Sequence, residues 1–193
     1  MRAVGIDLAG VASRPTGMCV MDGNLQASTN LVYADDDIVR QTIEAKADVA
    51  AIDAPLALPH GRESLAKRNS VHLRQCDREL LRMGIKFFPI TLGPMRQLTE
   101  RGILLKTTLE SKGLTVIETY PGAAQDIWQI PRKRRGLEKL AKGLSLVGVK
   151  GLVGTMSGDE LDAVTCALVG IMYLRGAYRA IGNPDEALMI LPR

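Results

Sequence analysis

The sequence has few of the residues that build disulfide frameworks, zinc sites or aromatic binding surfaces. Its three cysteines, Cys19, Cys76 and Cys166, lie far apart without a CxxC pair, a pattern typical of free thiols in a reducing compartment. The two histidines, His60 and His72, are too few for a histidine metal site. Aromatic residues make up only 4% of the chain, which argues against a stacking platform for single-stranded nucleic acid. Neither zinc nor disulfide chemistry is indicated.

A long hydrophobic run is also absent. The most apolar helix candidate, residues 163–174, is too short to cross a bilayer. Nothing before the first strand has the pattern of a secretory signal, so we expect a cytoplasmic protein without a membrane partner. The chain has 193 residues, of which 46% are hydrophobic and 24% charged, and this predicts one globular domain over residues 1–193.

Charge is distributed unevenly. The formal net charge is +4, and the main excess of positive charge lies at residues 132–135, which read Arg-Lys-Arg-Arg. Such a run favours a polyanionic partner such as nucleic acid. Its structural alternative is a solvated basic helix end.

The first quarter of the chain predicts a small antiparallel meander followed by a crossover. Strand-like segments at residues 2–9, 18–22 and 25–34 are separated by turn residues, which is typical of three antiparallel strands. Three aspartates at 35–37 then indicate the start of a helix of about three turns. The apolar segment 49–52 does not alternate with polar residues, as in a strand covered on both faces.

The remaining segments alternate between helices and buried strands. The pattern predicts another strand ending at Glu118, and two short strands within 178–192 around an Asn-Pro turn. Helices are expected at 63–83, with Gly84 as the stop, and at 95–113, 123–130, 137–148 and 157–176. The fold class is therefore α/β: a mixed central sheet, part antiparallel meander and part parallel strands, with helices on both faces. A right-handed crossover places the strand at 49–52 parallel to the first strand.

Two of the predicted strands end on an aspartate. Asp7 follows Val4 and Ile6 in the first strand, and Asp53 follows the strand at 49–52. If these strands are parallel neighbours about 4.8 Å apart, both carboxylates project at the same edge of the sheet. Two carboxylates that close repel each other, and a divalent cation is the simplest way to keep both ionised.

The late helix supplies two more acids. Ser157 and Glu160 have the spacing of a capping box, so the helix should begin at this point, with Asp159 and Asp162 on one face. Asp159 has a purely structural explanation, because acids are favoured in the first turn of a helix. Asp162 is harder to explain in this way, because the apolar positions that follow it should pack against the sheet.

Several motifs together carry a family resemblance. GIDLAG, AIDAP and DELDAVTCAL resemble the acidic signatures of the ribonuclease H-like superfamily, which includes Holliday-junction resolvases. More narrowly, the chain resembles domain-of-unknown-function family 429, regarded as predicted nucleases of that superfamily, through IDAPLALPHGR, RQCDRELLRMGIKFFP, MRQLTERG, ETYPGAAQDIWQIPRK and DELDAVTCAL. The resemblance covers nearly the whole chain and implies a ribonuclease H-like domain.

The resemblance also implies a site and a reaction. Asp7, Asp53, Asp159 and Asp162 would be metal ligands, and Asp7, Asp53, Asp162 and Glu118 would form the catalytic set. With Mg²⁺ or Mn²⁺ held by these carboxylates, the reaction would be hydrolysis of a phosphodiester bond, in which two ions activate water and stabilise the leaving oxygen.

Four basic residues are candidates for contact with the phosphates of a nucleic acid. They are Arg62, Arg74, Arg132 and Lys133. The structural alternative for the arginines before residue 83 is ion pairing with neighbouring acids on an exposed helix.

Two other functions stay open on the sequence alone. GIDLAG followed by Thr16-Gly17 also resembles the first phosphate motif of sugar kinases and actin-like ATPases, although those proteins normally use two such domains. A nucleic-acid-binding scaffold without catalysis is the other alternative. The choices between DNA and RNA, branched and linear substrates, endo- and exonuclease action, and monomer and homodimer stay open as well.

Overall fold

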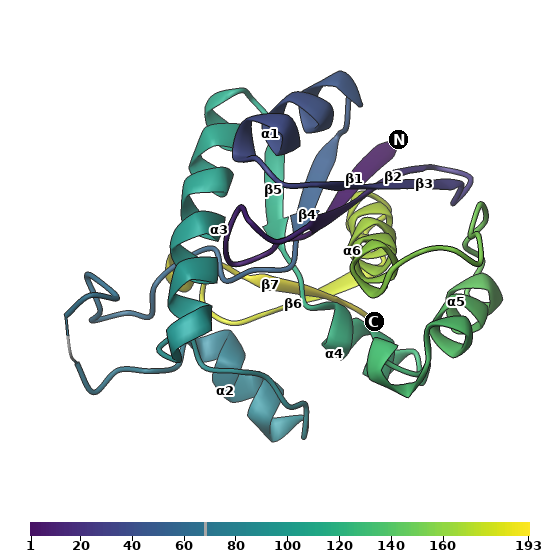
Figure 1. Cartoon of the computed structure of the whole chain (residues 1–193). Coiled ribbons are helices and arrows are strands. Elements are labelled where there is room, and N and C mark those ends of the chain that lie inside the picture. The colour runs from purple at the N-terminus through teal and green to yellow at the C-terminus, as the bar shows by residue number, and fades with distance from the viewer. Residues whose placement is uncertain (68) are drawn as a thin grey trace.

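A mixed β-sheet forms the centre of the computed structural model, which describes residues 1–67 and 69–193 (Figure 1). Over these residues the sheet has seven strands in the order β3-β2-β1-β4-β5-β7-β6. The strands are β1 (Arg2–Asp7), β2 (Thr16–Asp22), β3 (Ala27–Val32), β4 (Val49–Ile52), β5 (Thr115–Glu118), β6 (Tyr178–Ile181) and β7 (Met189–Pro192). The helices are α1 (Asp35–Glu44), α2 (Gln75–Arg82), α3 (Gly93–Ser111), α4 (Pro121–Ile127), α5 (Leu137–Leu146) and α6 (Gly158–Leu174), with 3₁₀ turns η1 (Lys133–Arg135) and η2 (Pro184–Glu186).

The strand pairing confirms the predicted topology. β1, β2 and β3 form an antiparallel meander. β4 lies parallel to β1, and β5 lies parallel to β4. At the other edge of the sheet β7 is parallel to β5 and antiparallel to β6. Because β1 and β4 are parallel neighbours, their C-terminal ends lie side by side at the same end of the sheet.

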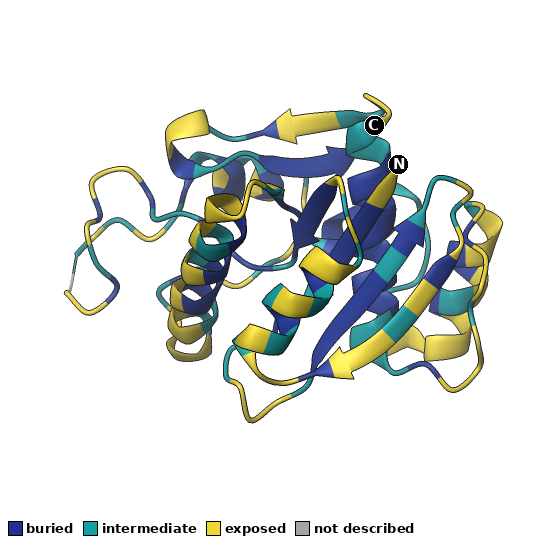
Figure 2. Ribbon diagram, turned by 90° about the horizontal axis from the view of Figure 1, so that it is seen from above, coloured by how far each residue is buried: buried dark blue, intermediate teal, exposed yellow. Residues whose placement is uncertain are grey.

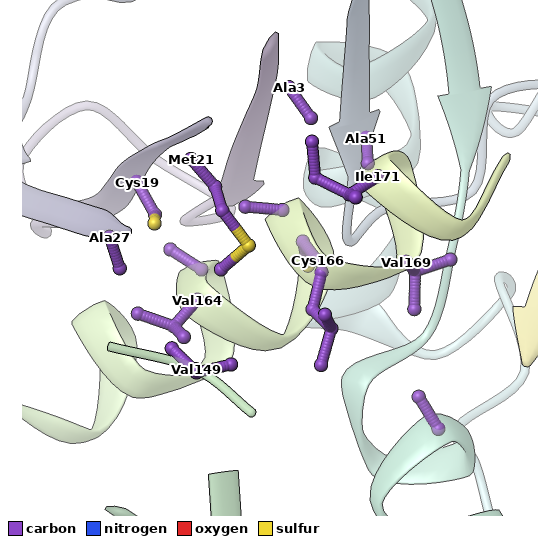
Figure 3. Packing of buried hydrophobic residues seen from close by; sticks show 14 of the residues in the cluster. Ala3, Cys19, Met21, Ala27, Ala51, Val149, Val164, Cys166, Val169 and Ile171 are labelled. Carbon is purple, nitrogen blue, oxygen red and sulfur yellow. The ribbon is translucent and has the colours of Figure 1, made fainter. Parts of the chain in front are cut away.

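Helices cover both faces of the sheet, as the sequence predicts. Figure 1 shows α1 and α3 on one side and α6 on the other. Val4 and Ile6 of β1 pack in the cluster that contains Leu105 and Leu109 of α3. Ala3 of β1 and Cys19 and Met21 of β2 belong instead to the cluster around α6, which Figure 3 shows from close by. Successive residues of a strand therefore serve different faces, with the alternation expected of β-structure.

Burial follows the same layers. Figure 2 shows the inner strands buried and the outer sides of the helices exposed. α6 is buried along most of its length, which explains why its sequence is apolar nearly all round. Among the helices of the described residues, none is both long enough and apolar enough to span a membrane.

Two glycines let α6 approach the sheet closely. A Cβ atom at Gly5 of β1 would lie 2.1 Å from the carbonyl oxygen of Ala163. A Cβ atom at Gly17 of β2 would lie 2.1 Å from the carbonyl oxygen of Asp159. These distances are far inside van der Waals contact, so only glycine permits the first turns of α6 to rest on β1 and β2.

The helix predicted at 63–83 is wrong in its first half. Helix α2 begins only at Gln75, and the preceding segment is irregular, with Arg68 outside the described residues. The reason is Arg62, whose guanidinium donates to the carbonyl oxygens of Ser64, Lys67, Asn69 and Val71. Carbonyls that converge on one side chain cannot at the same time form a helical hydrogen-bond ladder. The predicted stop at Gly84 is confirmed, with a φ of +72°.

Candidate metal centre

Asp7 and Asp53 come together because of the register of two parallel strands. Ile6 is paired with Ile52, and the backbone N–H of Asp53 donates to the carbonyl oxygen of Ile6 at 2.8 Å. The residues two positions earlier, Gly5 and Ala51, face α6. By alternation, Asp7 and Asp53 lie on the α6 face as well.

Helix α6 brings the other two aspartates to the same place. The Ser157 hydroxyl accepts from the backbone N–H of Glu160 at 3.2 Å, and the Glu160 carboxylate accepts from the N–H of Ser157 at 2.8 Å. This capping box begins the helix at Gly158, and the close contact at Gly17 presses its first turn onto the sheet. We call Asp7, Asp53, Asp159 and Asp162 the acid cluster.

Lys133 of η1 lies within the acid cluster. Its ammonium nitrogen is 2.9 Å from Asp162 Oδ2, 3.0 Å from Asp159 Oδ1 and 3.4 Å from Asp7 Oδ2. The sequence predicted Lys133 as a phosphate contact, on the basis of the basic run alone. The structure places its charge against carboxylates, an arrangement that local sequence does not indicate because the partners are distant along the chain.

The electrostatics of the cluster show an excess of negative charge. The pKa of Asp7 is raised to about 7, chiefly by burial and also by the charges of Asp162 and Asp159, while Lys133 opposes the rise. Burial also raises the pKa of Asp53 well above its usual value, and the neighbouring Asp7 adds to this. Burial alone would lower the pKa of Lys133, but Asp7 and Asp162 outweigh it and raise that pKa. One ammonium therefore does not neutralise the cluster.

The donor set fits a hard divalent cation. Carboxylate oxygens are the ligands that Mg²⁺ and Mn²⁺ prefer, and the raised pKa of Asp7 and Asp53 indicates a place where added positive charge is favourable. In the described residues, however, no group of three or more His, Cys, Asp or Glu side chains is arranged to hold a metal ion as it stands. The Lys133 ammonium lies where three of the four carboxylates converge.

Glu118 does not join the acid cluster. It is paired with Ile52, which faces α1 and α3, so its side chain lies on the opposite face of the sheet from Asp53. Its two oxygens accept from the guanidinium of Arg74, each at 2.6 Å, and one also accepts from the N–H of Leu56 at 2.8 Å. Burial raises the pKa of Glu118, and Arg74 opposes the rise. The expectation that this strand end adds a catalytic acid overlooks the alternation of faces.

Two of the expected phosphate contacts are internal. Arg74 is 1% exposed and pairs with Glu118 and, at 3.2 Å, with Asp77. Ion pairing was the structural alternative for this arginine, but it occurs in the interior and not on an exposed helix. Arg62 is also buried, and its donors are occupied by the loop carbonyls described above. The interior location explains both outcomes, because a buried guanidinium must have its donors satisfied.

Arg132 and a large cavity adjoin the cluster. Arg132 donates to Asp126 at 2.9 Å and to the Tyr120 hydroxyl at 3.0 Å, while part of its side chain stays exposed. The cavity, of about 1260 Å³, is lined by Asp53, Asp162, the basic residues 132–135 and several apolar side chains.

Both phenylalanines of the chain, Phe87 and Phe88, also line this cavity, and Phe88 is 61% exposed. A low aromatic content carries no information about where the few aromatics lie.

Comparison with known proteins now adds the family. Residues 5–187 match the family model described as "Protein of unknown function (DUF429)". The chain belongs to the DUF429 family. A search of curated protein sequences finds no match.

Two solved structures relate this DUF429 protein to a known fold. They are "Thermus thermophilus RuvC structure" and "T. thermophilus RuvC in complex with Holliday junction substrate". Each is 13% identical, with a TM-score of 0.50, and the match covers 91% of this chain and 97% of the other. The fold of this DUF429 protein is ribonuclease H-like, in agreement with the sequence analysis.

Proposed function

We propose that this DUF429 protein is a nuclease that hydrolyses phosphodiester bonds with a divalent cation, Mg²⁺ or Mn²⁺, held by the acid cluster. The observation that carries the proposal is the convergence of Asp7, Asp53, Asp159 and Asp162 from two parallel strands and one helix. Carboxylates in such close proximity repel one another and raise one another's pKa. Because this repulsion does not help to stabilise the fold, the cluster is a candidate functional site. The likeness of the fold to RuvC supports the same proposal.

The chain's own residues have distinct parts in this reaction. Asp7 and Asp53 end rigid, buried strands, so their carboxylates are held in place by the sheet and provide fixed ligands. Asp159 and Asp162 close the site from α6, where Gln125 donates to Asp162 Oδ1 at 2.7 Å and orients that carboxylate. When bound, the cation supplies an activated water and stabilises the charge on the leaving oxygen.

The proposed partner is nucleic acid. The cavity beside the acid cluster has a basic wall formed by residues 132–135, which would attract a phosphate backbone towards the carboxylates. One of the RuvC structures is described as a complex with a Holliday junction substrate, which makes branched DNA a sensible first substrate. Linear DNA and RNA belong in the same panel.

The test is cleavage of labelled linear and branched DNA and RNA with Mg²⁺ or Mn²⁺, comparing the natural protein with Asp7→Asn. We expect cleavage that needs the cation and falls by at least about a hundredfold in the variant. The matched control is Asp36→Asn, which removes an equal charge from an exposed position on α1, across the sheet from the site. Cation-independent cleavage, or activity unchanged by Asp7→Asn, would contradict the proposal. If the natural protein and Asp7→Asn both bind nucleic acid and neither cleaves it, the result would favour a scaffold.

A further inference from the structure

The position of Lys133 bears on the number of metal ions in the site. We propose that the Lys133 ammonium fills one of two cation positions in the acid cluster, so that the protein binds a single divalent ion, held by Asp7 and Asp53. The inference rests on the proposed function, which requires a metal at these carboxylates. It departs from the two-ion mechanism that the family resemblance implies.

The contacts divide the cluster into two parts. An ammonium group has three N–H donors, and Lys133 has three carboxylate partners, Asp7, Asp159 and Asp162. Both oxygens of Asp162 already have a partner on this side, because Oδ2 is 2.9 Å from Lys133 and Oδ1 accepts from Gln125. The ion pairs of Lys133 in the described part of the chain do not include Asp53, which lies beside Asp7 at the ends of the paired strands β1 and β4. Asp7 thus stands between the ammonium and Asp53.

Lys133 is held in this position from both sides. Arg132, the residue before it, is fixed by Asp126 and the Tyr120 hydroxyl. The turn closes after it, where the N–H of Gly136 donates to the carbonyl oxygen of Lys133 at 3.1 Å.

The lysine stem also fits against α6. A Cβ atom at Gly158 would lie 3.0 Å from Lys133 Cδ, so the missing side chain at 158 leaves room for the stem beside the helix start. Anchored at both ends of its turn and packed along its stem, Lys133 differs from a solvated surface lysine, whose ammonium is free to move.

The charges of the cluster agree with one ion. Metal binding requires ionised carboxylates, and with all four ionised the cluster and the Lys133 ammonium have a formal charge of −3 together. One divalent ion brings this to −1, whereas a second would have to enter against the positive charge of Lys133 and take its carboxylates. A fixed ammonium can itself stabilise the charge that develops on a phosphate oxygen.

The test is the stoichiometry of Mn²⁺ binding to the full chain, measured by titration calorimetry and by electron paramagnetic resonance. We expect one ion in the natural protein, with the spectrum of an isolated Mn²⁺. Lys133→Met keeps an unbranched stem but removes the charge, and we expect it to bind two ions and to give the spectrum of a coupled pair. Lys139→Met removes the same charge from an exposed position on α5 and should behave as the natural protein does.

Each outcome decides a separate question. Two ions in the natural protein would overturn the inference on their own, even if Lys133→Met does not fold. One ion in both the natural protein and Lys133→Met would also overturn it, because Lys133 would then hold no cation position. Failure of the proposed function has another signature: Mn²⁺ binding that is absent, or that is unchanged by Asp7→Asn, places the metal elsewhere than the acid cluster.

Discussion

Replacing Glu118 tests whether this acid stabilises the fold or takes part in catalysis. In Glu118→Gln the guanidinium of Arg74 stays buried but loses two charged bonds of 2.6 Å, and an amide N–H₂ now faces it. Breaking a buried ion pair by changing one partner typically destabilises a protein by about 3–5 kcal/mol. For a chain of this length, each kcal/mol lowers Tm by about 2–4 °C, so we expect a fall of about 6–20 °C.

The assay is thermal unfolding followed by circular dichroism, with urea denaturation to obtain the free energy of unfolding. Glu110→Gln is the matched control, because Glu110 pairs with Lys106 at 4.0 Å on an exposed face of α3 and the change should be worth about 1 kcal/mol or less. Cleavage is then measured at a temperature where both variants are folded. A Glu118→Gln protein with unchanged Tm and no activity would refute the reasoning and return Glu118 to the catalytic set.

Three further predictions concern the acid cluster, the contact between α6 and the sheet, and the loop that Arg62 organises. The pKa of Asp7 is raised from 3.8 to about 7, chiefly by burial, so the contribution of this group to stability is present below about pH 4 and is lost as the pH rises through 7. In EDTA, the free energy of unfolding of Asp7→Asn should therefore rise by about 2–3 kcal/mol relative to that of the natural protein between pH 5 and pH 8. An equal difference between the two proteins at both pH values in urea denaturation would contradict this. Gly5→Ala places a Cβ against the carbonyl oxygen of Ala163 and should destabilise the fold by at least about 1–3 kcal/mol in the same assay, whereas Gly154→Ala, with open space around it, should not. Arg62→Met removes the donors that bind the carbonyl oxygens of Ser64, Lys67, Asn69 and Val71. Trypsin should therefore cut this loop faster, while the affinity for Mn²⁺ stays the same. Resistance to trypsin equal to that of the natural protein would show that other contacts support the loop.

The sheet and most of its helical cover were predictable because their signals are local. Strand alternation, the capping box at Ser157 and the parallel crossover were enough to bring Asp7 and Asp53 to one edge. The strand ending at Glu118 was also predictable, but the face on which its side chain lies changes with a register shift of a single residue.

Contacts between distant segments were not predictable in the same way. The composition of residues 62–83 is typical of a helix, yet Arg62 organises a loop and Arg74 lies in the interior. Lys133 was recognised only as part of a charged run, because its three carboxylate partners come from β1 and α6. For each of these residues the partner, and not the residue type, determines the role.

The close approach of α6 to the sheet offers a way to sort relatives of this chain. The carboxylates of α6 reach those of β1 and β4 only while Gly5 and Gly17 have no side chains, so the spacing of the cluster is set by two residues that take no part in chemistry. A relative that keeps all four aspartates but carries a larger residue at position 5 or 17 would have its acids held apart. Such sequences are the ones in which to look for family members that keep the four aspartates but lack the proposed reaction.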